Sequence, residues 1–190
     1  YRANLKENLP FWTNDLQEAG YYCAYFGKWH VDRSLRLEKF GFAEYETEED
    51  AYSGYRAYRR QMGLPEKKPA PEHALHVEHK GYQPFTICGV SPEPVEASLE
   101  HYIYTRGIHF IEQQAEQQPG KPWVLVLSAL APHDPYIVPR EYAGRYDPHS
   151  IPQPASFSDN LAQRPAIYSR LQQVWQALDW EHFASITAHY

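Results

Sequence analysis

One feature constrains the fold of this chain more than any other: a continuous apolar run at residues 124–127, Val-Leu-Val-Leu. Because the run has no polar alternation, it predicts a strand covered on both faces, as in a parallel sheet with helices above and below. A segment of helical spacing, residues 97–114 with Leu99 and Ile103 near one face, comes before it, and the Pro-Gly-Lys-Pro at 119–122 ends that helix. This order indicates an α/β fold with a mostly parallel central sheet flanked by helices.

The beginning of the chain has the same order of elements. Residues 5–19 have helical composition, and Gly20 suits a helix C-terminus because glycine tolerates a positive φ. Residues 21–26 are aromatic and β-prone, which predicts a short buried strand. Lys28 and His30 then follow at the carboxyl end of that strand, where open α/β sheets bind their ligands.

Two long segments show little sustained periodicity. Residues 44–96 are acidic at their start and then rich in Tyr, Pro, His and Lys, so we expect a mostly irregular insertion over the site. Residues 135–160 contain five prolines that oppose regular structure, so we expect an extended surface loop. Helical spacing returns at Ile167 and Leu171, and residues 182–190 extend that stripe or begin a second helix.

Composition excludes several classes of partner. The formal net charge is -6, and no dense Lys/Arg block is present, which argues against nucleic acid or a membrane surface as a partner. An anionic ligand would therefore be held by a few placed groups. Cys23 and Cys88 lie in unlike contexts without C-x-x-C spacing, so neither a disulfide framework nor a zinc knuckle is indicated.

Three side chains carry the candidate chemistry. Lys28 and His30 follow the first expected strand, and His133 follows the apolar run at 124–127. Since the carboxyl ends of parallel strands face one crevice, these groups would form a cationic pocket for a tetrahedral oxyanion. A histidine there can also protonate a leaving oxygen near neutral pH. A single Lys or His at a strand end is, however, usually a solvated surface group.

A second histidine group has a different spacing. His73, His76 and His79 recur every three residues, roughly along one helical face. Pro71 and Gly81 bracket them, and no further ligand is implied. We favour a solvated histidine-rich loop over a zinc site.

The same residues carry a resemblance to a known family. Residues 16–21, Leu-Gln-Glu-Ala-Gly-Tyr, followed by Gly-Lys-Trp-His at 27–30, resemble the helix-strand-loop segment of sulfatases, members of the alkaline phosphatase superfamily. Pro-His-Asp-Pro-Tyr at 132–136 is similar to the family's Pro-His-x-Pro segment. The resemblance spans most of residues 10–145, and the closing helix at 182–190 resembles the next family element.

This resemblance implies a partial alkaline-phosphatase-like sandwich. Residues 1–190 would then be an incomplete sulfatase catalytic domain, truncated at both ends, and the full-length parent would hydrolyse sulfate esters while this chain alone is inactive. The family nucleophile is a formylglycine made from a cysteine in a Cys-x-Pro-Ser-Arg context, beside a calcium ion. Neither Cys23 nor Cys88 has that context, so the formylglycine and the calcium ligands are expected outside this chain.

By the same resemblance, Lys28 would bridge a sulfate oxygen and the nucleophile, holding the negative charge that grows in the transition state. His30 would hydrogen-bond the nucleophile's hydroxyl and help the covalent adduct collapse. His133 would contact the sulfate and the leaving oxygen as a general acid. Asp134 and Tyr136 are further candidates for substrate contact.

The expected substrate is a small sulfate ester or a sulfated saccharide. A phosphonate or phosphate ester hydrolase of the same superfamily is the main alternative, because the same cationic groups suit either anion. A non-catalytic remnant or binding module is a third interpretation, which the flanking genomic sequence would test. Compartment and oligomeric state stay open.

Overall fold

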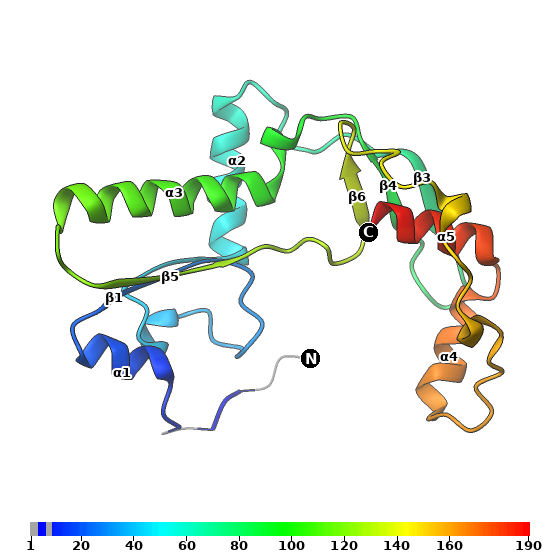
Figure 1. The fold of residues 1–190 in the computed structure, drawn as a ribbon, viewed down its shortest axis with the longest axis horizontal. Helices are drawn as coiled ribbons and strands as arrows, with labels where there is room; N and C mark the ends of the chain where they lie inside the picture. The colour runs from blue at the N-terminus through cyan, green and yellow to red at the C-terminus, as the bar shows by residue number, and fades with distance from the viewer. Residues whose placement is uncertain (1–3, 7–8) are drawn as a thin grey trace. The chain divides into compact units, whose positions relative to one another are not determined.

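The computed structural model describes residues 4–6 and 9–190, and within α2 (Glu48–Gln61) it describes the backbone alone for residues 48–52 (Figure 1). The chain divides into two compact units, one made of residues 1–67 and 96–130 and the other of residues 68–95 and 131–190. Within the described ranges, none of the helices combines the length and apolarity that a bilayer crossing requires.

The first unit is a three-layered α/β arrangement. Its sheet has the strand order β2-β1-β5, and both pairings are parallel. Helices lie on both sides of this sheet (Figure 1). The elements of the unit are α1 (Trp12–Glu18), β1 (Tyr22–Gly27), β2 (Glu44–Thr47), α2 (Glu48–Gln61), α3 (Leu99–Gln117) and β5 (Trp123–Ser128).

The central strand β1 is buried on both faces. Ala24 and Phe26 face α2 and α3, where Tyr102 and Phe110 are among the buried residues of the same cluster. Cys23, on the alternate face, packs in a second buried cluster, whose other buried members are Tyr25, Trp29, Leu37 and Phe42. The expected parallel sheet between helices is therefore confirmed, because successive side chains of β1 enter opposite apolar layers.

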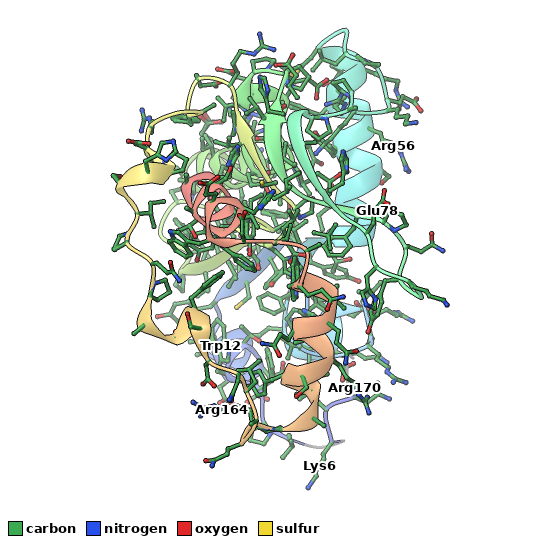
Figure 2. The ribbon with its side chains drawn as sticks, turned by 90° about the vertical axis from the view of Figure 1, so that its right-hand side faces the viewer. Lys6, Trp12, Arg56, Glu78, Arg164 and Arg170 are labelled. Atoms are coloured by element: carbon green, nitrogen blue, oxygen red, sulfur yellow. The ribbon has the colours of Figure 1, made fainter. Side chains whose placement is uncertain are left out.

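The second unit is built on another three-stranded sheet. Its order is β3-β4-β6, with β3 and β4 antiparallel and β4 and β6 parallel. Its core joins Cys88 of β4 to Val174 of α4 and Ile186 of α5, while Arg164 and Arg170 lie at exposed positions (Figure 2). The elements are β3 (Glu72–Val77), β4 (Phe85–Ser91), β6 (Tyr136–Pro139), α4 (Ala166–Trp175) and α5 (Trp180–His189).

The expected irregular insertion at 44–96 is wrong in its secondary structure. The segment contains β2, α2, β3 and β4. The helix α2 buries Tyr55, whose hydroxyl donates to the carbonyl of Ala97 at 2.5 Å. The half-buried Tyr58 of the same helix donates to the carbonyl of Glu96 at 3.0 Å. A helical face built from tyrosines gives only a weak apolar period, because each ring ends in a polar hydroxyl.

Two other boundaries differ from expectation. The first helix begins at Trp12 rather than near Leu5, because Pro10 lacks the amide hydrogen that a helix interior requires. The proline-rich loop expected at 135–160 includes the strand β6, which ends at Pro139. Among the described strands β6 pairs only with β4, and a proline is tolerated at the end of an edge strand.

Candidate functional site

The strands of the first unit end together at one edge of the sheet. Gly27 of β1 is in register with Thr47 of β2 and with Ser128 of β5. The amide of Lys28 donates to the carbonyl of Ser128 at 2.8 Å, so the pairing continues one residue beyond β1. Lys28 therefore lies at the carboxyl end of a central parallel strand, the edge at which α/β sheets bind ligands.

Gly27 permits the close approach of β1 and β5 at this edge. Its φ is +114°, and a Cβ atom there would lie 2.1 Å from the carbonyl oxygen of Ser128. Any other residue would push the two strands apart directly before Lys28. The close approach of these two strands thus explains why the Gly-Lys-Trp-His segment begins with a glycine.

Trp29 anchors the loop that carries the candidate cations. Its side chain is 1% exposed, its ring lies 5.3 Å from that of Tyr25, and its indole nitrogen donates to the carbonyl of Ser34 at 3.0 Å. The hydroxyl of Tyr25 also donates to the carbonyl of Lys28. Lys28 is half-buried and His30 is exposed, so the two flank a residue fixed in the core.

His133 and Asp134 lie in the second unit, where they are bonded to each other. The Nδ1 atom of His133 lies 2.8 Å from the carbonyl oxygen of Asp134 and 3.0 Å from its carboxylate. Both partners accept only, so Nδ1 carries the proton in this arrangement. The Nε2 atom is then the ring nitrogen available for chemistry, and the carboxylate orients the ring.

The structure brings the predicted residues together in two groups. Lys28 and His30 share one loop of the first unit, whereas His133, Asp134 and Tyr136 belong to the second. The meeting of the two groups around one anion stays a prediction. Tyr136 lies on β6, with its ring 5.6 Å from that of Tyr190, which gives it a packing role in its own unit.

Sequence reasoning missed a buried carboxylate in the Lys28 loop. Asp32 is 6% exposed, and its two oxygens accept from the amides of Ser34 at 2.7 Å and Leu5 at 2.5 Å. These two backbone bonds lower the pKa of Asp32, because they stabilise the carboxylate form. The available signal was Asp-Arg-Ser, an aspartate two residues before its partner, which is typical of an Asx-turn.

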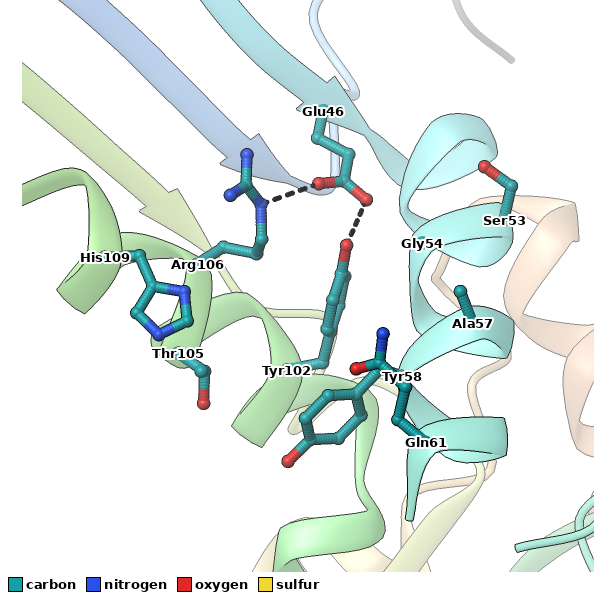
Figure 3. Close-up of a pocket in the computed structure, with 10 residues that line it drawn as sticks. All are labelled: Glu46, Ser53, Gly54, Ala57, Tyr58, Gln61, Tyr102, Thr105, Arg106 and His109. Carbon is teal, nitrogen blue, oxygen red and sulfur yellow. Dashed lines mark hydrogen bonds and ion pairs between the residues drawn. The ribbon is translucent and has the colours of Figure 1, made fainter. Parts of the chain in front are cut away.

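A groove of about 540 Å³ lies between α2 and α3 (Figure 3). Three of its polar groups are bonded to one another, since Glu46 accepts from the hydroxyl of Tyr102 at 2.6 Å and from Arg106 at 3.1 Å. Burial, with the adjacent Glu46, raises the pKa of Tyr102. Lys28, His30 and His133 do not line it; the lining residues are Glu46, Ser53, Gly54, Ala57, Tyr58, Gln61, Tyr102, Thr105, Arg106 and His109.

The residues present do not fit a formylglycine or a calcium ion. Cys23 and Cys88 are 0% and 1% exposed within strands, and burial raises the pKa of both thiols. Among the side chains that the structure describes, those of residues 4–6, 9–47 and 53–190, no cluster of three or more His, Cys, Asp or Glu could hold a metal ion.

The three spaced histidines do not share a helical face. His73 and His76 lie on the strand β3, whose side chains alternate across the sheet. The Nδ1 atom of His76 is 3.1 Å from the hydroxyl of Thr86 on β4. The histidine-rich loop expected here is therefore partly a strand, while His73 and His76 are exposed, as a solvated segment requires.

The chain is similar to proteins of one family. A family model described as Sulfatase matches residues 3–176. The chain is 26% identical over 159 residues to an uncharacterized sulfatase, YidJ, of Escherichia coli (strain K12), a match covering 84% of this chain and 30% of that protein. It is 22% identical over 148 residues to a choline-sulfatase of Rhizobium meliloti (strain 1021), covering 76% of this chain and 27% of that protein.

A solved structure shares the fold. Phosphonate monoester hydrolase SpPMH from Silicibacter pomeroyi has a TM-score of 0.68 and 20% sequence identity, over 98% of this chain and 41% of that one. This likeness confirms the α/β fold class. The chain spans about 30% of the length of the curated relatives it matches.

Proposed function

The chain belongs to the sulfatase family, and we propose from this premise that it forms part of an enzyme that hydrolyses sulfate esters. In this proposal Lys28, His30 and His133 hold the sulfate group. The substrate is a small sulfate ester or a sulfated saccharide. Calcium and formylglycine, which the family resemblance implies, would be supplied by residues other than those described here.

One observation carries the proposal. Lys28 lies at the carboxyl end of β1, and the neighbouring strand β5 ends in register with it at Ser128. His133 follows β5 in the sequence by five residues, so both candidate cations come shortly after neighbouring strands that end at one edge of the same sheet. Ligands of α/β sheets bind beyond the carboxyl ends of such strands, and this order of residues supports the proposed shared site.

Each side chain has a chemical role suited to a tetrahedral anion. The ammonium group of Lys28 binds sulfate oxygens and stabilises the charge that increases on them in the transition state. The Nε2 atom of His133, when protonated, donates its proton to the leaving oxygen, so that an alcohol rather than an alkoxide departs. His30 contributes a further hydrogen bond to the reacting group from the loop held by Trp29.

Asp134 acts on the reaction through His133 in this proposal. It occupies the Nδ1 position, which leaves the opposite ring nitrogen for the leaving group. Asp134 is therefore a positioning residue rather than a direct substrate contact. Tyr136, which packs on Tyr190, is a weaker candidate for contact with substrate.

A phosphonate or phosphate ester hydrolase is the second candidate. The fold is shared with a phosphonate monoester hydrolase, and the same cations suit a phosphoryl group. The test is the turnover of matched aryl sulfate and aryl phosphonate esters by the full-length protein. Higher kcat/KM for the sulfate ester supports the proposal, and a preference for the phosphonate ester overturns it. Hydrolysis of neither ester would support the non-catalytic interpretation.

A further inference from the structure

Asp32 is the only acidic side chain that is buried among the residues the structure describes. It lies two residues after His30, in the loop that carries both candidate cations of the first unit. A carboxylate is removed from water at a high cost unless hydrogen bonds compensate it. Because Asp32 is buried next to the proposed site, we looked for a role of this carboxylate in the site as well as in the folding of the loop.

The two oxygens of Asp32 hold two separate pieces of backbone. One oxygen accepts from the amide of Ser34 at 2.7 Å and closes a tight turn directly after His30. The other oxygen accepts from the amide of Leu5 at 2.5 Å, and Leu5 lies 27 residues earlier in the chain. The carboxylate thus ties the loop both to itself and to a distant segment.

Ser34 is held at both of its backbone polar groups. Its amide donates to Asp32 at 2.7 Å, and its carbonyl accepts from the indole of Trp29 at 3.0 Å. Trp29 is 1% exposed and Asp32 is 6% exposed, so both anchors are fixed in the interior. His30 and Val31 form the exposed tip between these anchors. A loop closed in this way has few conformations available at its tip.

We propose that Asp32 is a positioning residue that fixes the imidazole of His30 for catalysis. This inference rests on the proposed function. Without the carboxylate, the turn after His30 would open and the ring would sample several positions. A displacement of about 1 Å in a catalytic group can reduce the rate by about 10²-fold. Lys28 would be less affected, because its own amide remains bonded to Ser128.

The test is a double-mutant cycle in the full-length protein, with kcat for an aryl sulfate as the readout. We expect Asp32→Ala to lower kcat by about 10- to 100-fold with a smaller change in KM. Asp32→Asn keeps the shape of the side chain and one acceptor oxygen, so it should lower kcat less than Asp32→Ala does. It also serves as the test variant if Asp32→Ala does not fold.

The cycle separates positioning from general destabilisation. If Asp32 acts through His30, the loss caused by Asp32→Ala disappears in a His30→Ala background. An undiminished loss in that background overturns the inference. Asp147→Ala is the matched control, because Asp147 accepts from the amide of His149 at 3.0 Å in the same two-residue pattern, and it should leave kcat unchanged.

The single variants distinguish the two levels of the proposal. A His30→Ala protein with wild-type kcat contradicts the role proposed for His30, and the inference about Asp32 is then overturned with it. A His30→Ala protein with reduced kcat, together with an Asp32→Ala protein of wild-type kcat, leaves the proposed function in place. That combination overturns the positioning role of Asp32 alone.

Discussion

Asp134 accepts the Nδ1 proton of His133 twice, through its carbonyl oxygen at 2.8 Å and its carboxylate at 3.0 Å. The histidine therefore keeps one tautomer even when one of these acceptors is lost. Both side chains are about half exposed, so the pair lies where a substrate can reach it. Such a pair suits a general acid, whose ring must be oriented while its second nitrogen stays accessible.

His133→Ala should lower kcat for sulfate esters by about 10²- to 10⁴-fold, the range for loss of a general acid. Asp134→Ala should lower it by no more than about tenfold, because the backbone carbonyl still accepts the Nδ1 proton. Steady-state kinetics on esters with good and poor leaving groups provide the check. An equal loss for both leaving groups in His133→Ala would contradict the general-acid role.

Lys28→Ala should raise the barrier by about 3 kcal/mol, which corresponds to a loss of 10²- to 10³-fold in kcat, because a preorganised charge opposite the reacting oxygens is removed. Lys121→Ala is the control, since the ammonium of Lys121 lies 5.6 Å from the ring centre of Tyr22, the first residue of β1, whereas Lys28 follows the last residue of that strand. Near wild-type turnover in Lys28→Ala, measured under saturating substrate, would exclude Lys28 from the site.

Gly54→Ala should destabilise the packing of α2 on α3. The added Cβ would lie 2.1 Å from the hydroxyl of Tyr102 and 2.4 Å from Glu46. Overpacking of this kind costs about 1–3 kcal/mol, which exceeds the gain of about 1 kcal/mol from replacing glycine in a helix. Urea unfolding measures the change, and Tyr102→Phe in the same protein should restore part of the stability. Unchanged stability in Gly54→Ala would contradict this prediction.

Glu38 should make stability depend on pH in the acid range. The hydroxyl of Tyr45 donates to its carboxylate at 2.5 Å, and this bond, with Arg36 beside it, lowers the pKa of Glu38 from 4.5 to about 2. The unfolded chain binds the proton more tightly, so this contribution is present above about pH 4.5 and is lost as the pH falls toward 2. Glu38→Gln should flatten the fall in unfolding free energy over that window, and an unchanged slope would contradict it.

The sequence predicted those elements whose burial follows a simple apolar pattern. The run at 124–127 became β5, and residues 97–114 lie largely within α3, because leucine, valine and isoleucine report burial directly. The helix α2 was missed because the residues it buries include Tyr55 and Arg59. Arg59 is 1% exposed, and its guanidinium group donates twice to the carbonyl of Pro65, at 2.9 Å and 2.8 Å. A buried arginine satisfied by carbonyl oxygens has no signature in hydrophobic periodicity.

The residues of the candidate site could likewise be predicted only in part. Lys28 was expected at the end of a strand and lies there, because Gly27 marks the strand end plainly. Asp32 was missed because a single aspartate in a polar stretch resembles any solvated residue until its two amide partners are known. The bond between His133 and Asp134 depends on side-chain rotamers, which the order of residues does not specify.

The most direct test is a crystal structure of the full-length protein with inorganic sulfate bound. We expect one sulfate ion whose oxygens lie about 3 Å from both the Nζ atom of Lys28 and the Nε2 atom of His133, within hydrogen-bond range. A sulfate bound by Lys28 with His133 directed elsewhere, or the reverse, would contradict the shared anion site.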